Sequence, residues 1–118
     1  MHVECRSIES VQIAQLFGSL VGAETQEVKH QLNQLVTQQS PYLIIDLGSL
    51  NFIDIRGLST FVSVLKRAQY YQGDVLLLNP TTKVRALIEL TQLQYTFSIY
   101  LDENAAVAYC AQKKTRHP

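Results

Sequence analysis

The sequence predicts an α/β fold: a single domain in which a mixed, mostly parallel β-sheet is flanked by about four helices. Two apolar runs, residues 42–47 and 74–78, are each followed by a helical pattern, which is typical of strands buried on both faces of a parallel sheet. Two alternating runs at the start of the chain predict an antiparallel hairpin, so the sheet is expected to be mixed. A chain of 118 residues is long enough for one domain with its own core.

The first half of the chain begins with the hairpin, expected at residues 3–8 and 11–16, where apolar and polar side chains alternate around a turn. Gly18 and Gly22 are expected to mark the exit from its second strand. The first helix is expected at residues 24–38 and ends before Pro41, because the residue before a proline avoids the α region. The apolar stripe of this helix consists of Val28, Leu32, Leu35 and Val36.

A central unit follows, in which the strand at 42–47 leads through a loop at 48–57 into a second helix at 58–72. Gly73 is expected at the C′ position of that helix. The helix has an apolar face directed to the core and an outer face that carries polar residues. The core-facing residues are Leu58, Phe61, Val62 and Leu65, and the outward residues are Ser59, Ser63, Lys66, Arg67 and Tyr70.

The second half continues with the strand at 74–78 and a third helix that starts at Asn79 and Pro80. A last strand is expected at 96–101, followed by a helix that Asp102 caps and that ends at about Lys113. The domain is therefore expected to comprise residues 1–113, with 114–118 as a polar tail. The predicted core includes Ile44, Ile45, Phe61, Leu65, Leu76 and Leu87.

Composition narrows the classes of function. Ten Lys and Arg residues balance ten Asp and Glu residues, and this zero net charge argues against nucleic acid as the main partner. No apolar run approaches the length of a membrane span, and the N-terminus lacks the order of a signal peptide, so no membrane insertion is expected. Cys5 and Cys110 are expected to be reduced thiols that serve as small apolar residues. A cytoplasmic location is therefore expected.

The residues offer little for catalysis or metal binding. His2, His30 and His117 are scattered without ligand spacing, so no metal and no cofactor is expected. Asp54 is interpreted as a helix-cap or loop-ordering residue rather than a general base, and Asp74 is expected at the opposite edge of the sheet because it begins its strand. Ser59 and Ser63 have no evident histidine base, so a nucleophilic role is remote and no enzyme activity is expected.

Several short motifs along the chain form a family pattern. Asp46-Leu47 ends the central strand, Phe52-Ile53-Asp54 and Gly57-Leu58 open the second helix, and a glycine at 73 precedes the strand at 74–78. Together with Asn79-Pro80, these features resemble the STAS domain family of bacterial anti-sigma-factor antagonists over nearly the whole chain. The resemblance implies a regulatory binding module that docks on an anti-sigma factor of the switch-protein serine kinase type.

The motif that carries the family's switch is altered here. The family has an Asp, two small residues that usually include the phosphorylated Ser or Thr, and then Gly-Leu, whereas this chain reads Asp54-Ile55-Arg56-Gly57-Leu58. Arg56 therefore stands where the resemblance places the phosphoacceptor. Two interpretations of Arg56 remain open: it contacts a carboxylate of the partner, or it is a solvated side chain paired with Asp54.

The loop at 48–57 is expected at the carboxyl ends of the strands, where α/β proteins usually place their sites. The predicted partner surface consists of Ser49, Asn51, Asp54, Ile55, Arg56, Gly57, Ser59, Ser63 and Arg67. Ser59 and Thr60 are the candidate positions for phosphorylation in this segment. A second function, a STAS scaffold subunit in a stressosome-like particle or in the cytoplasmic part of a transporter, also fits the resemblance. The partner itself and the oligomeric state are not specified by the sequence.

Overall fold

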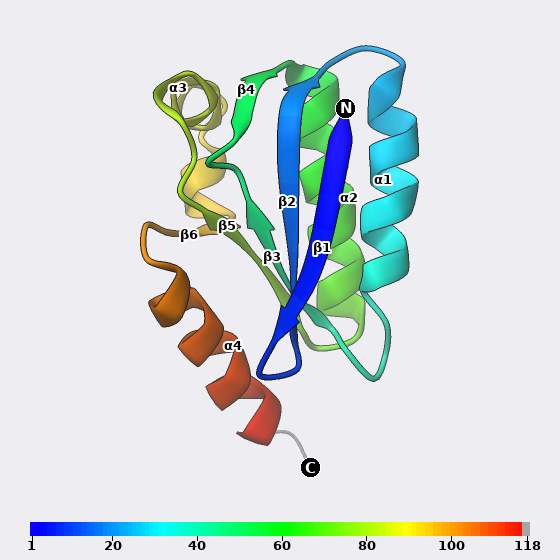
Figure 1. Cartoon of the computed structure of the whole chain (residues 1–118), viewed down its shortest axis with the longest axis vertical. Helices are drawn as coiled ribbons and strands as arrows, with labels where there is room; N and C mark the ends of the chain where they lie inside the picture. Colours follow the sequence, from blue (N-terminus) through cyan, green and yellow to red (C-terminus); the bar gives the residue numbers. More distant parts are fainter. Residues whose placement is uncertain (117–118) are drawn as a thin grey trace.

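The computed structural model describes residues 1–116, with side chains through Lys113, as a six-stranded mixed sheet with helices on both faces (Figure 1). The strand order is β1-β2-β3-β5-β6, and β4 pairs with β2 beside this path. Among these strands only the β1–β2 pair is antiparallel. The strands are β1 (His2–Ile8), β2 (Val11–Leu20), β3 (Tyr42–Asp46), β4 (Leu50–Ile53), β5 (Asp74–Leu78) and β6 (Ser98–Tyr100).

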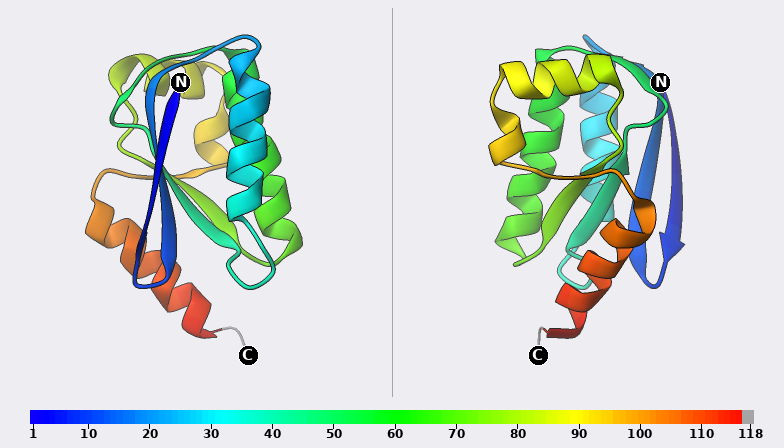
Figure 2. Two further views of the ribbon diagram at one scale, coloured as in Figure 1. Left: turned by 45° about the vertical axis from the view of Figure 1, so that its right-hand side comes forward. Right: turned by 90° about the vertical axis from the view of Figure 1, so that its left-hand side faces the viewer.

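The helices form two layers around the sheet. α1 and α2 pack side by side on one face, and α4 covers the other face (Figure 2). α3 packs against β4 and is followed by a short 3-10 turn, η1 (Leu93–Tyr95). The helices are α1 (Glu24–Leu35), α2 (Ile55–Tyr70), α3 (Thr82–Leu90) and α4 (Glu103–Arg116). This α/β architecture confirms the predicted fold class.

The two central strands, β3 and β5, are buried on both faces because a hydrophobic cluster lies on each side of the sheet. Along β3, Leu43 and Ile45 face the cluster under α1 and α2, whereas Ile44 faces the cluster under α4. This explains why β3 reads as a continuous apolar run rather than as an alternation. Of the predicted core, Ile44, Ile45, Phe61, Leu65 and Leu76 are buried, but Leu87 is only partly buried at the edge of the cluster.

Several boundaries differ from the sequence-based expectation. β2 continues to Leu20, because after pairing with β3 it pairs with β4, and Gly18 with a φ of 96° lies at the register shift rather than at a strand exit. The segment predicted as a loop contains β4, and α2 starts at Ile55 instead of Leu58. α1 ends at Leu35, and α4 continues to Arg116.

The glycine that follows α2 has a different role from the predicted one. Gln72, with a φ of 63°, occupies the left-handed C′ position, and the Gly73 amide donates to the Ala68 carbonyl at 2.7 Å as the next residue of a Schellman motif. A Cβ on Gly73 would lie 1.9 Å from the Pro41 carbonyl oxygen. Gly73 is therefore required by this close approach and not by its backbone dihedral.

Neither Cys5 nor Cys110 forms a disulfide, and only one of them is buried. Cys110 lies in the cluster under α4, whereas Cys5 is exposed on β1, the edge strand of the sheet. The expectation that both cysteines serve as small apolar residues therefore fits Cys110 but not the exposed Cys5, because an edge strand is covered on fewer sides than a central strand.

Candidate functional site

Asp54 holds the start of α2 in place and joins it to the loop that precedes α1. Its Oδ1 accepts a hydrogen bond from the Gly57 amide at 2.9 Å, and its Oδ2 accepts one from the Gly22 amide at 3.0 Å. These two bonds hold the pKa of the Asp54 carboxyl below its usual value, because they stabilise the charged form. The predicted role of Asp54 as a helix cap is confirmed.

Gly57 allows the first turn of α2 to lie directly on the ends of β2 and β4. A Cβ at this position would lie 2.5 Å from Ile53 Cγ1 and 2.7 Å from the Leu20 carbonyl oxygen. Both distances are too short for a side chain. The Gly-Leu pair of the motif therefore serves to seat the helix, with Leu58 buried beneath it.

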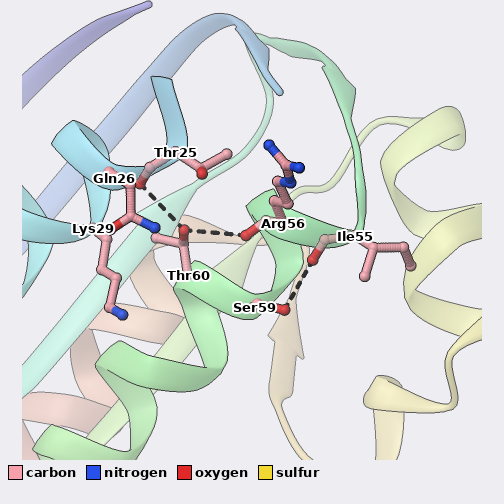
Figure 3. A pocket seen from close by; sticks show the side chains of 7 residues that line it. All are labelled: Thr25, Gln26, Lys29, Ile55, Arg56, Ser59 and Thr60. Carbon is pink, nitrogen blue, oxygen red and sulfur yellow. Dashed lines mark hydrogen bonds between the residues drawn. The ribbon is translucent and has the colours of Figure 1, made fainter. Parts of the chain in front are cut away.

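A shallow depression of about 270 Å³ lies between the first turns of α1 and α2 (Figure 3). α1 contributes Thr25, Gln26 and Lys29, and α2 contributes Ile55, Arg56, Ser59 and Thr60. Two cations thus border one depression at the positive end of the α2 dipole. Lys29 and Arg56 are the charged side chains that line this depression, and its other lining side chains are neutral.

Arg56 is exposed, and its side chain points away from Thr60 (Figure 3). Within the described residues no ion pair joins its guanidinium to Asp54, whose oxygens are both occupied by backbone amides. Direct pairing with Asp54, one of the two interpretations of Arg56, is thus not observed. A cation at the N-terminus of a helix interacts unfavourably with the dipole, by up to ~1 kcal/mol.

The two hydroxyls considered as phosphorylation sites differ in accessibility. Ser59 is exposed and donates to the Ile55 carbonyl at 3.0 Å, a bond that an outward rotation would release. Thr60 is 2 % exposed, and its hydroxyl lies 3.4 Å from the Thr25 carbonyl and 3.3 Å from the Arg56 carbonyl. Of the two, Ser59 alone is accessible to an enzyme without local opening of the helix.

The remaining predicted surface residues do not form one continuous patch. Asn51 is exposed on β4, while Ser49 is half-buried and accepts from Gln15 Nε2 at 3.1 Å. Ser63 is half-buried one turn after Ser59. Arg67, one turn further, donates from Nε to the Val36 carbonyl at 2.8 Å and lies over the Tyr71 ring. Arg67 therefore ties the end of α1 to α2, away from the depression.

Sequence reasoning missed several residues of this region. Lys29 and Gln26 reach the depression from α1, and Phe52 on β4 is 53 % exposed with Lys83 Nζ 5.1 Å from its ring centroid. Phe52 lies inside the segment assigned to the site. An aromatic residue in a predicted loop is the feature of the sequence that could have indicated its exposure there. Nothing in the sequence indicated Lys29, because its position depends on how α1 packs against α2.

The described residues contain no group of three or more His, Cys, Asp or Glu residues that could hold a metal ion. Asp46 lies at the carboxyl end of β3 and Asp74 at the start of β5, so the sheet separates them as predicted. Burial raises the pKa of the Asp74 carboxyl. No helix within residues 1–116 is long and apolar enough to cross a membrane.

This fold and this motif define a class of protein: the chain belongs to the STAS domain family, whose profile matches residues 2–106. BtrV of Bordetella bronchiseptica, whose name describes it as a putative anti-sigma factor antagonist, is 26 % identical over 108 residues, which cover 92 % of this chain and 93 % of BtrV. The chain is thus a STAS domain whose sequence is similar to that of an anti-sigma factor antagonist.

Solved structures agree with this fold. The anti-sigma factor antagonist SpoIIAA in its unphosphorylated form has a TM-score of 0.79 at 18 % identity, covering 92 % of this chain and 95 % of SpoIIAA. An anti-sigma factor antagonist from Mycobacterium paratuberculosis has a TM-score of 0.82 at 19 % identity, covering 92 % of each chain. The murine anion transporter Slc26a9 also matches, with a TM-score of 0.76 at 16 % identity, over 92 % of this chain but 18 % of the transporter.

Proposed function

We propose that this chain is a non-enzymatic binding module that docks on an anti-sigma factor of the serine-kinase type through the surface around the start of α2. The observation that carries the proposal is the exposure of Ile55 and Arg56 on a helix start that Asp54 and Gly57 hold in a fixed position. Exposed apolar and cationic side chains on a rigid element suit a protein contact, because little entropy is lost when they bind.

The proposed surface joins three kinds of contact. Ile55 is 58 % exposed and Phe52 53 % exposed, and they offer apolar area on either side of Asp54. Arg56 and Lys29 offer positive charge, and Asn51 and Ser59 offer hydrogen-bonding groups. Such a mixture of apolar and polar groups is typical of interfaces that form and dissociate. Three of the predicted residues are left out of this surface, because Ser49 and Ser63 are half-buried and Arg67 lies away from the depression.

Arg56 also bears on regulation. A phosphate at this position would add roughly −1.5 to −2 charges at a helix start that favours anions, whereas Arg56 places a permanent cation there. The proposal is therefore that docking is not released by phosphorylation at residue 56. Control would act through the abundance of the protein or through Ser59, since Thr60 is buried.

A binding experiment tests the role of Arg56. The partner kinase is first captured from extract of the native cell by pull-down and identified by mass spectrometry, then purified. Arg56→Glu is expected to weaken its binding by at least ~1 kcal/mol if the cation faces a carboxylate. Lys66→Glu, the same charge change on an exposed part of α2 outside the proposed surface, is the matched control. Equal affinities of wild type and Arg56→Glu would show that Arg56 is only a solvated side chain.

A phosphorylation experiment tests the absence of a switch. The wild type and Arg56→Ser, which restores an acceptor, are incubated with the purified kinase and ATP, and the phosphate is located by mass spectrometry. Phosphate on the introduced serine of the Arg56→Ser variant, with none on the wild type, is the expected result. Phosphate on the wild type within residues 49–60 would show that the protein is switched by phosphorylation after all, and phosphate on Ser59 would favour control through that residue over control by abundance.

The second candidate function is a STAS component of a larger assembly, such as a stressosome-like particle or a transporter. The similarity to part of Slc26a9 favours it on fold alone. In that case the pull-down would yield a particle of high mass or a membrane complex rather than a kinase.

A further inference from the structure

β1 leaves an entire strand edge open. It is the end strand of the sheet, it pairs with β2 on one side, and no other element within residues 1–116 covers its outer side (Figure 2, right). The seven residues of β1 pair with β2 without any register shift, and the strand contains neither proline nor glycine. Natural sheets usually protect such an edge with a bulge, a proline, a very short strand or charged side chains. Of these devices β1 has only the charged side chains, Glu4 and Arg6. The opposite edge strand, β6, is protected by its length of three residues.

The turn between β1 and β2 determines which backbone groups face outward. Glu9 and Ser10 have φ values of 52° and 65°, which is the type I′ turn of a two-residue hairpin. In such a hairpin the residues that flank the turn, Ile8 and Val11, form a hydrogen-bonded pair. From there, hydrogen-bonded and non-hydrogen-bonded pairs alternate along the two strands. The even-numbered residues of β1 therefore bond to β2. The amides and carbonyls of Val3, Cys5 and Ser7 point to the open edge.

This alternation restricts how two copies of β1 can pair. In an antiparallel pair, a residue whose backbone groups face outward must lie opposite another such residue. Odd-numbered residues of one β1 therefore lie opposite odd-numbered residues of the other, and even-numbered residues lie opposite even-numbered ones. When Cys5 lies opposite Cys5 of a second copy, every residue of β1 is paired. In this register Glu4 of each copy lies opposite Arg6 of the other copy. Moving the register by two residues in either direction places Glu4 opposite Glu4 or Arg6 opposite Arg6. Like charges directly opposite each other destabilise a sheet.

We propose that β1 is a self-association surface, on which a second copy of this chain adds its own β1 in antiparallel orientation with Cys5 on the two-fold axis. The occupant is identified by charge complementarity, because one register both pairs the whole strand and sets every Glu4 against an Arg6. Outward-facing pairs at Cys5 and between Val3 and Ser7 each exchange two backbone hydrogen bonds. The result is a closed dimer with one sheet continuous through both copies.

Arg6 can serve this contact without leaving its partner within the chain. Its Nη1 donates to Glu103 Oε2 at 3.0 Å, and its Nη2 donates to Glu103 Oε1. A guanidinium has five N–H donors, so donors remain for the Glu4 carboxylate of the second copy. Glu4 and Arg6 form a non-hydrogen-bonded pair, the type in which opposite side chains lie closest. The strand contact is small, so the dimer is expected to be weak and dependent on concentration.

Sedimentation equilibrium of the purified wild type, Glu4→Arg, Arg6→Glu and their mixture tests the register. The wild type is expected to dimerise, and each single variant is expected to associate about five-fold more weakly or worse, because like charges then face each other. Mixing Glu4→Arg with Arg6→Glu should restore a dimer, since each Arg then meets a Glu. Circular dichroism verifies that each variant folds, as Arg6→Glu also loses the contact with Glu103.

Two further measurements complete the test. Ser7→Pro removes an outward-facing amide and should abolish the dimer while β1 remains paired with β2. A short bis-maleimide should cross-link two copies of the wild type through Cys5, and Cys5→Ser should not be cross-linked, since Cys110 is buried. A wild type that remains monomeric up to about 1 mM would overturn the proposal. A dimer that tolerates both charge reversals and Ser7→Pro would overturn it equally, by placing the contact elsewhere.

Discussion

At the scale of single residues, the start of α2 depends on one carboxylate with two backbone partners. Asp54 accepts from Gly57 within the helix and from Gly22 outside it, so the same side chain caps the helix and fixes the neighbouring loop. An N-cap side chain contributes typically ~1 kcal/mol to stability. The hydrogen bonds that make this contribution also hold the pKa of Asp54 below its usual value.

Asp54→Ala is expected to lower the free energy of unfolding at pH 7 by about 0.5–2 kcal/mol. Because the folded-state pKa of Asp54 is lowered, its contribution is present above the unfolded-state pKa and is lost as pH falls through the folded-state pKa. Denaturant titrations at several pH values between neutral and about pH 2 measure this dependence.

Asp54→Asn is the control, since asparagine caps helices nearly as well as aspartate but does not titrate. It should keep most of the stability at pH 7 and lose the part of the acid dependence that Asp54 supplies. An Asp54→Asn variant that destabilises as much as Asp54→Ala would show that the charge, and not the cap geometry, makes the contribution.

At the scale of elements, α2 is the helix through which the core and the candidate site are connected. Its buried stripe runs through Leu58, Phe61, Val64, Leu65 and Ala68. Its first turn meanwhile exposes Ile55 and Arg56. Packing of the stripe therefore determines where the exposed residues lie, and loss of packing would also move the site.

Leu65→Ala is expected to cost about 2–5 kcal/mol, because Leu65 is 2 % exposed and its removal leaves a cavity in a close-packed core. Leu90→Ala is the matched control: Leu90 is 79 % exposed on α3, and its truncation should change stability by less than ~0.5 kcal/mol. Urea denaturation of both variants gives the comparison. A loss below ~0.5 kcal/mol for Leu65→Ala would mean that the inner face of α2 is assigned wrongly.

The sequence predicted the elements whose periodicity is strong and missed those whose pairing is tertiary. β3 and β5 were evident because burial on both faces leaves a continuous apolar run. β4 was not, because its outer residues, Asn51 and Phe52, are adjacent and do not alternate with the buried Leu50 and Ile53. The strand is held by its pairing with β2 after the shift at Gly18, which no local pattern encodes.

The candidate site shows the same division. The motif indicated Asp54 and Gly57, whose roles are local: one accepts the amide three residues later, and the other lies against β2 and β4. The contribution of Lys29 and the structural use of Arg67 depend on how α1 lies against α2. The spacing of Ser59, Ser63 and Arg67 correctly placed them along one helix, but spacing does not determine which neighbour each side chain meets.

At the scale of the whole molecule, the sheet joins two hydrophobic clusters into one folding unit. The cluster under α1 and α2 and the cluster under α4 use alternate residues of the same strands, such as Ile45 and Ile44. If β3 detached from one of these clusters, the residues that it contributes to the other cluster would also be exposed. The described domain is therefore expected to unfold in a single cooperative transition.

The two thiols report on this cooperativity. Cys5 is exposed and should react at once with a thiol reagent, whereas Cys110 is buried under α4 and should react only when the domain opens. Labelling of Cys110 in a Cys5→Ser background is expected to follow the same denaturant midpoint as the far-ultraviolet circular dichroism. Because neither thiol forms a disulfide within the chain, reductant should leave the thermal midpoint of the monomer unchanged. Reaction of Cys110 at clearly lower denaturant would show instead that α4 detaches while the rest of the sheet stays folded.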